Sequence, residues 1–241
     1  MRVVAFDTAT ARTTVALRDL ETEDNVCLAA VVDLALADDP PPGARPGHAQ
    51  RLLVMIHELF EQAGAGWDAV DRIAVGVGPG TFTGLRIGIA TAEALGYATS
   101  TPLLGISTLR SLALGAHERE PDSAKLAVID ARRGEAFVAG WGSGSDPLAA
   151  GPELSARVLR PDQLVRVAAT SGTRVLAVGD GALKFRDELE RGGASVPAPN
   201  SPLHLVAARE HCRLAAFGAA DPTRRVEPEY LRPSDAELAQ P

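Results

Sequence analysis

The chain has 241 residues, a formal net charge of −7 and 46% hydrophobic residues. This length can bury the core of one large domain or two smaller lobes, and the composition excludes collagen-like and disordered proteins. The acidic balance argues against nucleic-acid binding by this chain alone, because its own charge would repel phosphates. The N-terminus MRVVAFD is too soon acidic for a signal peptide, and no run reaches the roughly 20 apolar residues of a membrane span. We therefore expect a cytoplasmic protein that does not enter a membrane.

The first part of the chain predicts three strands in an antiparallel meander. Val3–Phe6 is a short apolar run that ends at Asp7, and Thr13–Arg18 is rich in β-branched residues. Val26–Val32, which follows a polar loop, is the expected third strand. The segment 38–47, DDPPPGARPG, can hold neither a helix nor a central strand, so we expect a mobile surface loop there.

A helix and a strand–turn–helix unit follow. Apolar residues at helical spacing predict an amphipathic helix from His48 to about Ala63; they are Leu52, Met55, Ile56, Leu59 and Phe60. Arg72–Val77 is a candidate buried strand that leads into the glycine-rich run 76–96, and the second half of this run is expected to be helical. A strand, a glycine-rich turn and a helix in this order are typical of α/β proteins.

The second half of the chain repeats this order, with a strand that ends in Asp130, a hairpin and later a helix. We interpret the repetition as an internal duplication. The predicted elements are strands at 126–129, 136–141 and 174–178, a hairpin turn at 132–134, a helix at 203–217 and an extended segment at 222–233.

The glycine-rich turn has two interpretations. Gly76, Gly78 and Gly80 precede a helix, where free backbone N–H groups could bind a phosphate. The run matches neither common phosphate-binding glycine motif and contains no lysine. Tight packing of the loop is therefore the alternative that we favour.

The helical half of this run carries small residues at every fourth position, namely Gly84, Gly88, Ala92 and Gly96. These residues form one shallow stripe along a helix. Each glycine costs about 1 kcal/mol relative to alanine inside a helix, so another backbone is expected to come close. That neighbour is either a partner protein, which makes the stripe part of a subunit interface, or the same lobe.

Five blocks of the sequence, in this order, resemble motifs of the TsaB (YeaZ) family of tRNA threonylcarbamoyladenosine biosynthesis proteins. They are Asp7–Thr10 (DTAT), Gly76–Gly88 (GVGPGTFTGLRIG), Gly105–Leu109 (GISTL), Asp130–Glu135 (DARRGE) and Glu227–Arg232 (EPEYLR). The chain departs from the family pattern in its longer proline-rich segment before His48, in Thr81 for the usual serine and in Phe137 for the usual tyrosine.

The resemblance implies an α/β, two-lobed actin-like and Hsp70-like (ASKHA, ribonuclease H-like) fold. It places an N-terminal lobe at 1–107, a C-terminal lobe at 108–233 and a tail at 234–241, with the option that helix 203–217 packs back on the N-terminal lobe. It also implies a non-catalytic partner subunit of TsaD, which modifies the adenosine next to the anticodon of tRNAs that read ANN codons. The implied partners are TsaD and TsaE, with a homodimer when the chain is alone and tRNA only through the complex.

The resemblance and the two glycine features together give the candidate site residues. The expected partner interface is Leu52, Ile56, Phe60, Gly84, Arg86, Gly88, Ala92 and Gly96. The residues expected near a nucleotide are Asp7, Gly78, Gly80, Thr81, Asp130 and Arg132. We expect no cofactor of the chain's own, with ATP or ADP as an option at the junction with TsaD.

A stand-alone ATPase is the alternative function. ASKHA enzymes use an aspartate at the end of the first strand of each lobe, and Asp7 and Asp130 stand at such positions. The first phosphate loop of such enzymes needs a glycine where this chain has Ala9, because a side chain there crowds the phosphates. We therefore interpret this loop as lost and Asp7 as a group that caps a turn or faces a helix.

Other chemistries find little support in the sequence. No two histidines have the i, i+4 spacing of a helical metal site, and His48 is expected at the surface. No Ser/His/Asp arrangement is evident, so no protease activity is expected. Cys27 and Cys212 lie far apart and are expected to be buried free thiols.

Overall fold

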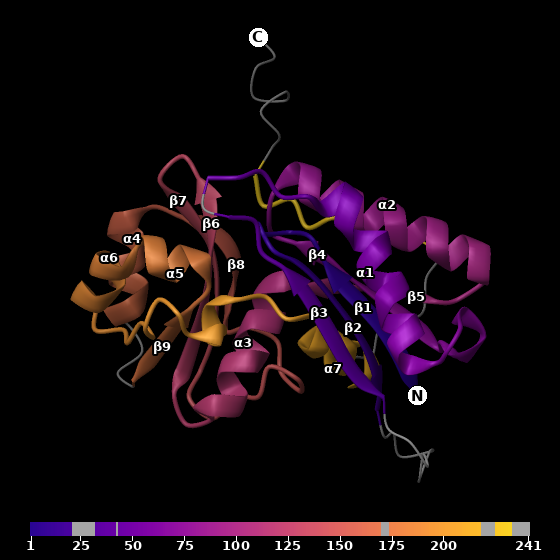
Figure 1. Ribbon diagram of the computed structural model, residues 1–241. Coiled ribbons are helices and arrows are strands. Elements are labelled where there is room, and N and C mark those ends of the chain that lie inside the picture. The colour runs from indigo at the N-terminus through magenta and orange to yellow at the C-terminus, as the bar shows by residue number, and fades with distance from the viewer. Residues whose placement is uncertain (21–31, 42, 170–173, 218–224, 233–241) are drawn as a thin grey trace.

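The computed structural model shows a two-lobed α/β protein (Figure 1). It describes residues 1–20, 32–41, 43–169, 174–217 and 225–232. Each lobe is built on one mixed β-sheet, and helices cover both faces of each sheet. Among the described residues, no helix has both the length and the apolar character needed to cross a membrane.

The sheet of the N-terminal lobe has five strands in the order β3-β2-β1-β4-β5. The first three strands form an antiparallel meander, while β1, β4 and β5 run parallel. The strands are β1 (Arg2–Asp7), β2 (Thr13–Asp19), β3 (Asp33–Asp38), β4 (Arg72–Gly78) and β5 (Leu103–Ser107).

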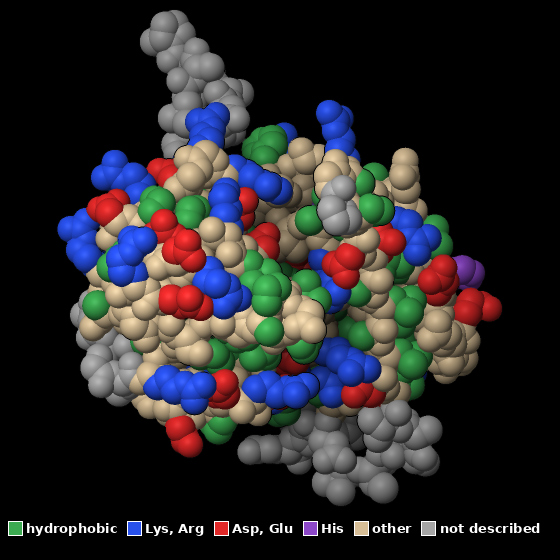
Figure 2. Space-filling model, turned by 60° about the vertical axis from the view of Figure 1, so that its left-hand side comes forward, with side chains coloured by type: hydrophobic (Ala, Val, Ile, Leu, Met, Phe, Trp, Pro, Cys, Tyr) green, Lys and Arg blue, Asp and Glu red, His purple; other side chains and the backbone are tan. Residues whose placement is uncertain are grey.

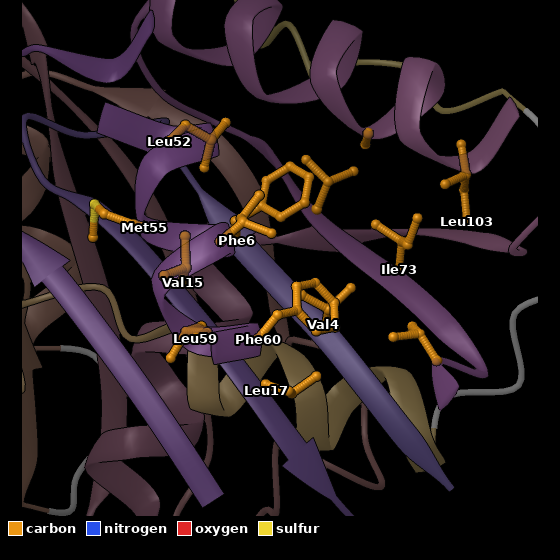
Figure 3. Packing of buried hydrophobic residues seen from close by; sticks show 14 of the residues in the cluster. Val4, Phe6, Val15, Leu17, Leu52, Met55, Leu59, Phe60, Ile73 and Leu103 are labelled. Carbon is orange, nitrogen blue, oxygen red and sulfur yellow. The ribbon is translucent and has the colours of Figure 1, made fainter. Parts of the chain in front are cut away.

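Alternation along β1 and β2 gives this sheet two apolar faces. One face packs against α1 (His48–Ala63) and α2 (Phe82–Thr99), which are the helices predicted from the apolar stripe and from the glycine-rich run. Figure 3 shows how the two layers meet. The residues in contact include Val4, Phe6, Val15 and Leu17 from the sheet and Leu52, Met55, Leu59 and Phe60 from α1.

The sheet of the C-terminal lobe has four strands in the order β8-β7-β6-β9. This is the order of the first four strands of the N-terminal sheet, with the same parallel and antiparallel pairs, so the predicted internal duplication is confirmed at the level of topology. The strands are β6 (Ala124–Arg132), β7 (Glu135–Trp141), β8 (Leu154–Leu159) and β9 (Val175–Val178).

The helices around this second sheet divide between its two faces. One face is covered by α4 (Pro161–Ala169), α5 (Asp180–Lys184) and α6 (Arg186–Arg191). The other face packs against α3 (Thr108–Arg119), which begins directly after β5 and lies between the lobes.

The second face of the N-terminal sheet is covered by α7 (Ala208–Phe217). Cys212 of this helix is a buried free thiol that packs on Val3 and Ala16, as expected for it, whereas Cys27 lies outside the described residues. The predicted helix 203–217 was too long at its start, because residues 202–204 form a separate 3₁₀ turn (η2) that begins with Pro202.

The third strand differs from its prediction. It runs from Asp33 to Asp38, while residues 26–31 of the predicted strand lie outside the described part of the chain. Leu34 and Leu36 face the first core and alternate with exposed residues. Apolar residues therefore recur at every second position of β3, whereas the run 26–32 is apolar throughout.

Candidate functional site at the end of the first strand

Asp7 ends β1 and is completely buried. Its Oδ2 atom accepts hydrogen bonds from Thr108 Oγ1 at 2.8 Å and from His211 Nε2 at 3.0 Å, and its Oδ1 atom accepts one from the backbone of Ala9 at 2.6 Å. Burial by itself would raise the pKa of Asp7. The hydrogen bond and charge of His211, with the bonds from Ala9 and Thr108, outweigh burial and hold this pKa below its usual value.

The same histidine continues the network into α3. His211 Nδ1 lies 3.0 Å from Ser111 Oγ, so a serine, a histidine and an aspartate are joined in a row. The expectation that no such arrangement exists was wrong, because these residues come from elements about 100 positions apart and no local spacing reveals them. All three are buried, so in this arrangement no substrate can reach Ser111, and the network ties α3 and α7 to the end of β1.

The glycine-rich turn packs on residues 8 and 9 of the same lobe. Thr81 donates its backbone N–H to the carbonyl oxygen of Ala9 at 2.7 Å. Thr8 Oγ1 donates to the carbonyl oxygen of Gly84 at 2.7 Å. A side chain at Gly80 would collide with the backbone of Ala9. A donor that could have bound a phosphate is thus used inside the lobe, which supports tight packing over a phosphate cradle.

The small-residue stripe of α2 faces inward. A Cβ atom at Gly88 would lie 2.5 Å from Thr8 Oγ1, and one at Gly96 would lie 2.5 Å from the side chain of Leu103. Gly84 meets the backbone of Thr8, and Ala92 is fully buried. The neighbours of the stripe are therefore the turn after β1 and the start of β5.

The expected partner-interface residues of α1 are buried as well. Leu52, Ile56 and Phe60 lie in the first core, and of the eight expected residues only Arg86 is exposed. These residues are buried because the apolar stripe of a surface helix packs against its own sheet. A partner would meet the opposite faces of α1 and α2. The exposed apolar or small residues there include Leu53 and Val54 on α1 and Ala90, Ala94 and Tyr97 on α2.

Asp130 in the second lobe forms ion pairs with two cationic side chains of its own lobe. Its carboxylate pairs with Lys184 at 2.7 Å and with Arg132 at 3.3 Å, and its backbone N–H donates to Asp180 at 3.0 Å. Burial is the main cause that raises the pKa of Asp180. Arg132 is largely exposed. It is the first residue of the predicted hairpin turn 132–134, and Arg132, Arg133 and Gly134 all have positive φ.

A small pocket lies between the lobes and has a volume of about 90 Å³. Sites for drug-sized molecules usually measure about 300–1,000 Å³, so a nucleotide does not fit in this pocket as it stands. None of the six residues expected near a nucleotide lines it. Its walls are Thr10, Ala11, Arg12, Asp39, Leu112, Asp180, His204, Leu205 and Val206.

The structure also places His48. This histidine begins α1 but is buried, contrary to the expected surface position, and its Nδ1 atom lies 2.8 Å from Thr13 Oγ1. Burial lowers the pKa of His48. Within the described ranges, no three His, Cys, Asp or Glu side chains are grouped as a metal site requires.

Side chains of both signs are mixed on the surface. On the face shown in Figure 2, Lys and Arg residues alternate with Asp and Glu instead of forming one continuous basic area. A broad phosphate-binding surface requires clustered positive charge, and this face does not offer it.

Comparisons with known proteins agree with the fold. The family model of TsaD, described as tRNA N6-adenosine threonylcarbamoyltransferase, matches residues 40–146. The solved structure of YeaZ from Pseudomonas aeruginosa has a TM-score of 0.74 and 30% identity, and the match covers 95% of this chain and 99% of that chain. The two sheets of shared strand order are the two lobes of an actin-like, Hsp70-like (ASKHA) fold.

Two curated relatives carry the same name. The tRNA threonylcarbamoyladenosine biosynthesis protein TsaB of Haemophilus influenzae is 38% identical over 39% of this chain and 40% of that protein. The TsaB protein of Escherichia coli (strain K12) is 32% identical over 96% of this chain and 95% of that protein. Since this second similarity extends over nearly the full length of both proteins and the folds agree, the chain belongs to the TsaB (YeaZ) family.

Proposed function

We propose that this chain is the non-catalytic partner subunit of TsaD in the threonylcarbamoylation of adenosine next to the anticodon of tRNAs that read ANN codons. The observation that carries this proposal is the closed end of β1. Both carboxylate oxygens of Asp7 accept hydrogen bonds from its own chain, and Thr81 donates its backbone N–H to Ala9. These contacts within the lobe support a subunit that does not hold phosphates at the end of β1 as an ASKHA enzyme would.

The partnership is supported by the outward faces of α1 and α2. Leu53 and Tyr97 are 54% and 84% exposed, and Ala90 and Ala94 leave a low surface between Arg86 and Tyr97 on which another helix can lie close. The region that the TsaD model matches contains both helices, which favours pairing of similar lobes. In the absence of TsaD, the same face can pair with a second copy of this chain.

The remaining parts of the proposal rest on the charge of the chain and on what its resemblance to the TsaB family implies. The chain is acidic, so tRNA is bound through the complex and not by this subunit alone. The subunit brings no cofactor, TsaE joins the complex, and any ATP or ADP lies at the junction with TsaD. The complex acts in the cytoplasm, where its tRNA substrates are found.

Co-expression with TsaD followed by native mass measurement tests the partnership. We expect a heterodimer with the natural chain, and loss of at least 90% of it for Leu53→Asp or Tyr97→Asp, because a charge buried in an apolar interface costs several kcal/mol. Phe217→Asp is the matched control, since Phe217 is similarly exposed but lies on α7. A heterodimer that survives both changes on α1 and α2, or that Phe217→Asp alone disrupts, contradicts the proposed face.

The alternative function, a stand-alone ATPase, is tested with the isolated chain. We expect no steady ATP hydrolysis, and we expect threonylcarbamoylated tRNA only when TsaD, TsaE and the carbamoyl-AMP synthase are added. Steady turnover by the isolated chain would reverse the assignment of a non-catalytic role.

A further inference from the structure

The segment 225–232 follows α7 and lies in the structure without helix or strand pairing. Figure 1 shows it in yellow, near the start of α2 and the tips of β6 and β7. We call it the strap. It contacts both lobes, although neither core requires it to complete a sheet.

The strap is fixed to the N-terminal lobe by its first half. Val226 is 92% buried and belongs to the first core. Glu229 donates its backbone N–H to the carbonyl oxygen of Val77 on β4 at 2.8 Å. Gly105 leaves room for this contact, because a Cβ atom there would lie 2.7 Å from the side chain of Val226. The first half of the strap therefore packs closely against the N-terminal lobe.

Tyr230 continues the contact to α2. Its ring stacks on the ring of Phe82 with 5.6 Å between the centroids, and Arg86 lies over the same phenylalanine at 3.8 Å. Such stacked and cation–π contacts add attraction beyond the area that they bury. The first turn of α2 is thus linked to the strap by side chains.

The last two residues of the strap contact the C-terminal lobe. Leu231 packs against the core between α3 and the second sheet. Arg232 pairs with Glu135 Oε2 at 2.9 Å through Nη1 and donates to the carbonyl oxygen of Ala131 at 3.0 Å through Nη2. One guanidinium therefore holds both strands of the β6–β7 hairpin next to its turn, in a half-buried setting where such bonds are stronger than at an open surface.

We propose that the strap is an interlobe latch, in which Arg232 holds the β6–β7 hairpin to the N-terminal lobe through Glu135 and Ala131. With its first half seated in one lobe and its guanidinium bound to the other, the strap restricts motion between the lobes at the hairpin. Opening of the Arg232–Glu135 pair releases the hairpin while both cores remain folded. This device acts within one chain and does not depend on the proposed partner.

Amide hydrogen exchange of the full isolated chain tests the latch. In Arg232→Ala and in Glu135→Gln we expect exchange at residues 131–137 to rise by about tenfold, with no change in α1 or β1, because a charge-assisted contact is removed at the hairpin alone. Arg132→Ala is the matched control. It removes an ion pair from the same hairpin that does not involve the strap, and it should leave exchange at Ala131 and Glu135 near that of the natural chain.

The charge swap Glu135→Arg with Arg232→Glu separates a latch from a local packing effect. We expect the swap to recover part of the lost protection, since the ion pair is restored with its ends exchanged while a carboxylate at position 232 cannot donate to the carbonyl oxygen of Ala131. Unchanged exchange in Arg232→Ala and Glu135→Gln, an equal rise over both lobes, or no recovery in the swap would each overturn the proposal.

Discussion

At the scale of the residue, Asp7 shows how the same side chain can serve chemistry or structure. An aspartate at the end of the first strand of an ASKHA lobe stands where a nucleotide-binding enzyme needs it, yet here its oxygens are taken by Ala9, Thr108 and His211. The predicted capping of the turn after β1 and the contact with a helix are both present. A buried carboxylate with three donors is a structural anchor.

This anchor predicts a large loss of stability in Asp7→Asn. We expect the free energy of unfolding to fall by on the order of 3 kcal/mol near neutral pH, because one partner of a buried, charged hydrogen-bond network is removed. Urea unfolding measures this change. Asp162→Asn is the control, since Asp162 pairs with Arg166 on an exposed helix surface and such pairs are worth less than about 1 kcal/mol. Equal losses in the two variants would contradict the role of Asp7.

The same residue also predicts a dependence on pH. The pKa of Asp7 is lower in the folded chain than in the unfolded chain, so its ionised form stabilises the fold above about pH 4. This contribution is lost as the pH falls through the folded pKa. We expect the difference in unfolding free energy between the natural chain and Asp7→Asn to shrink on acidification below that value, and a constant difference would argue against an ionised Asp7.

At the scale of the element, α2 explains why a helix keeps several glycines. Its stripe crosses Thr8 and the side chain of Leu103, and a Cβ atom at Gly84 would collide with the backbone of Thr8. The stripe is thus the inner surface of the lobe, and its helical spacing reflects one continuous contact. The outward face of the same helix carries the exposed residues Ala90, Ala94 and Tyr97.

Two glycine-to-alanine changes separate packing from helix propensity. Gly84→Ala should destabilise the chain, because the added Cβ meets the backbone of Thr8, which cannot move aside as a flexible side chain would. Gly115→Ala in α3 should instead stabilise it by up to about 1 kcal/mol, since the nearest atom outside its own helix backbone is Glu210 Cγ at 3.8 Å. Thermal unfolding of both variants gives the signs. Stabilisation by Gly84→Ala would show that the close approach is absent.

At the scale of the whole molecule, two lobes with a shared strand order have α3 between them, and one pocket at their junction has a volume of about 90 Å³. The end of β1, the glycine-rich turn and Asp130 each satisfy their polar groups within the chain. The polar groups at these three places are therefore bound within the chain. This is the arrangement expected of a subunit that supports a related catalytic subunit.

Isothermal titration of the isolated chain with MgATP tests this view of the molecule. We expect no saturable binding up to millimolar ligand, because an interlobe pocket of about 90 Å³ cannot enclose a nucleotide. Micromolar binding that is lost in Asp180→Asn would show that the lobes open and that the pocket is a nucleotide site. Binding only after TsaD is added would place the nucleotide at the subunit junction.

The sequence by itself determined α1, the helical half of the glycine-rich run, the hairpin turn and the family. The bounds of α1 were predicted correctly because its apolar residues repeat with the helical period, and the turn at 132–134 was predicted because a glycine follows two polar residues between apolar strands. These features depend on residues close together in the chain, where periodicity and turn chemistry are sufficient.

Only the tertiary structure decided what each pattern contacts. The glycine stripe predicted a close neighbour, but the fold showed that this neighbour is Thr8 and the lobe itself. His211 and Asp7 are hydrogen-bonded although they lie about 200 positions apart, and Arg232 pairs with Glu135 over about 100 positions. No local spacing in the sequence predicts either contact. A sequence pattern tells that a face is buried, whereas the packing of distant elements determines what buries it and which face is left for a partner.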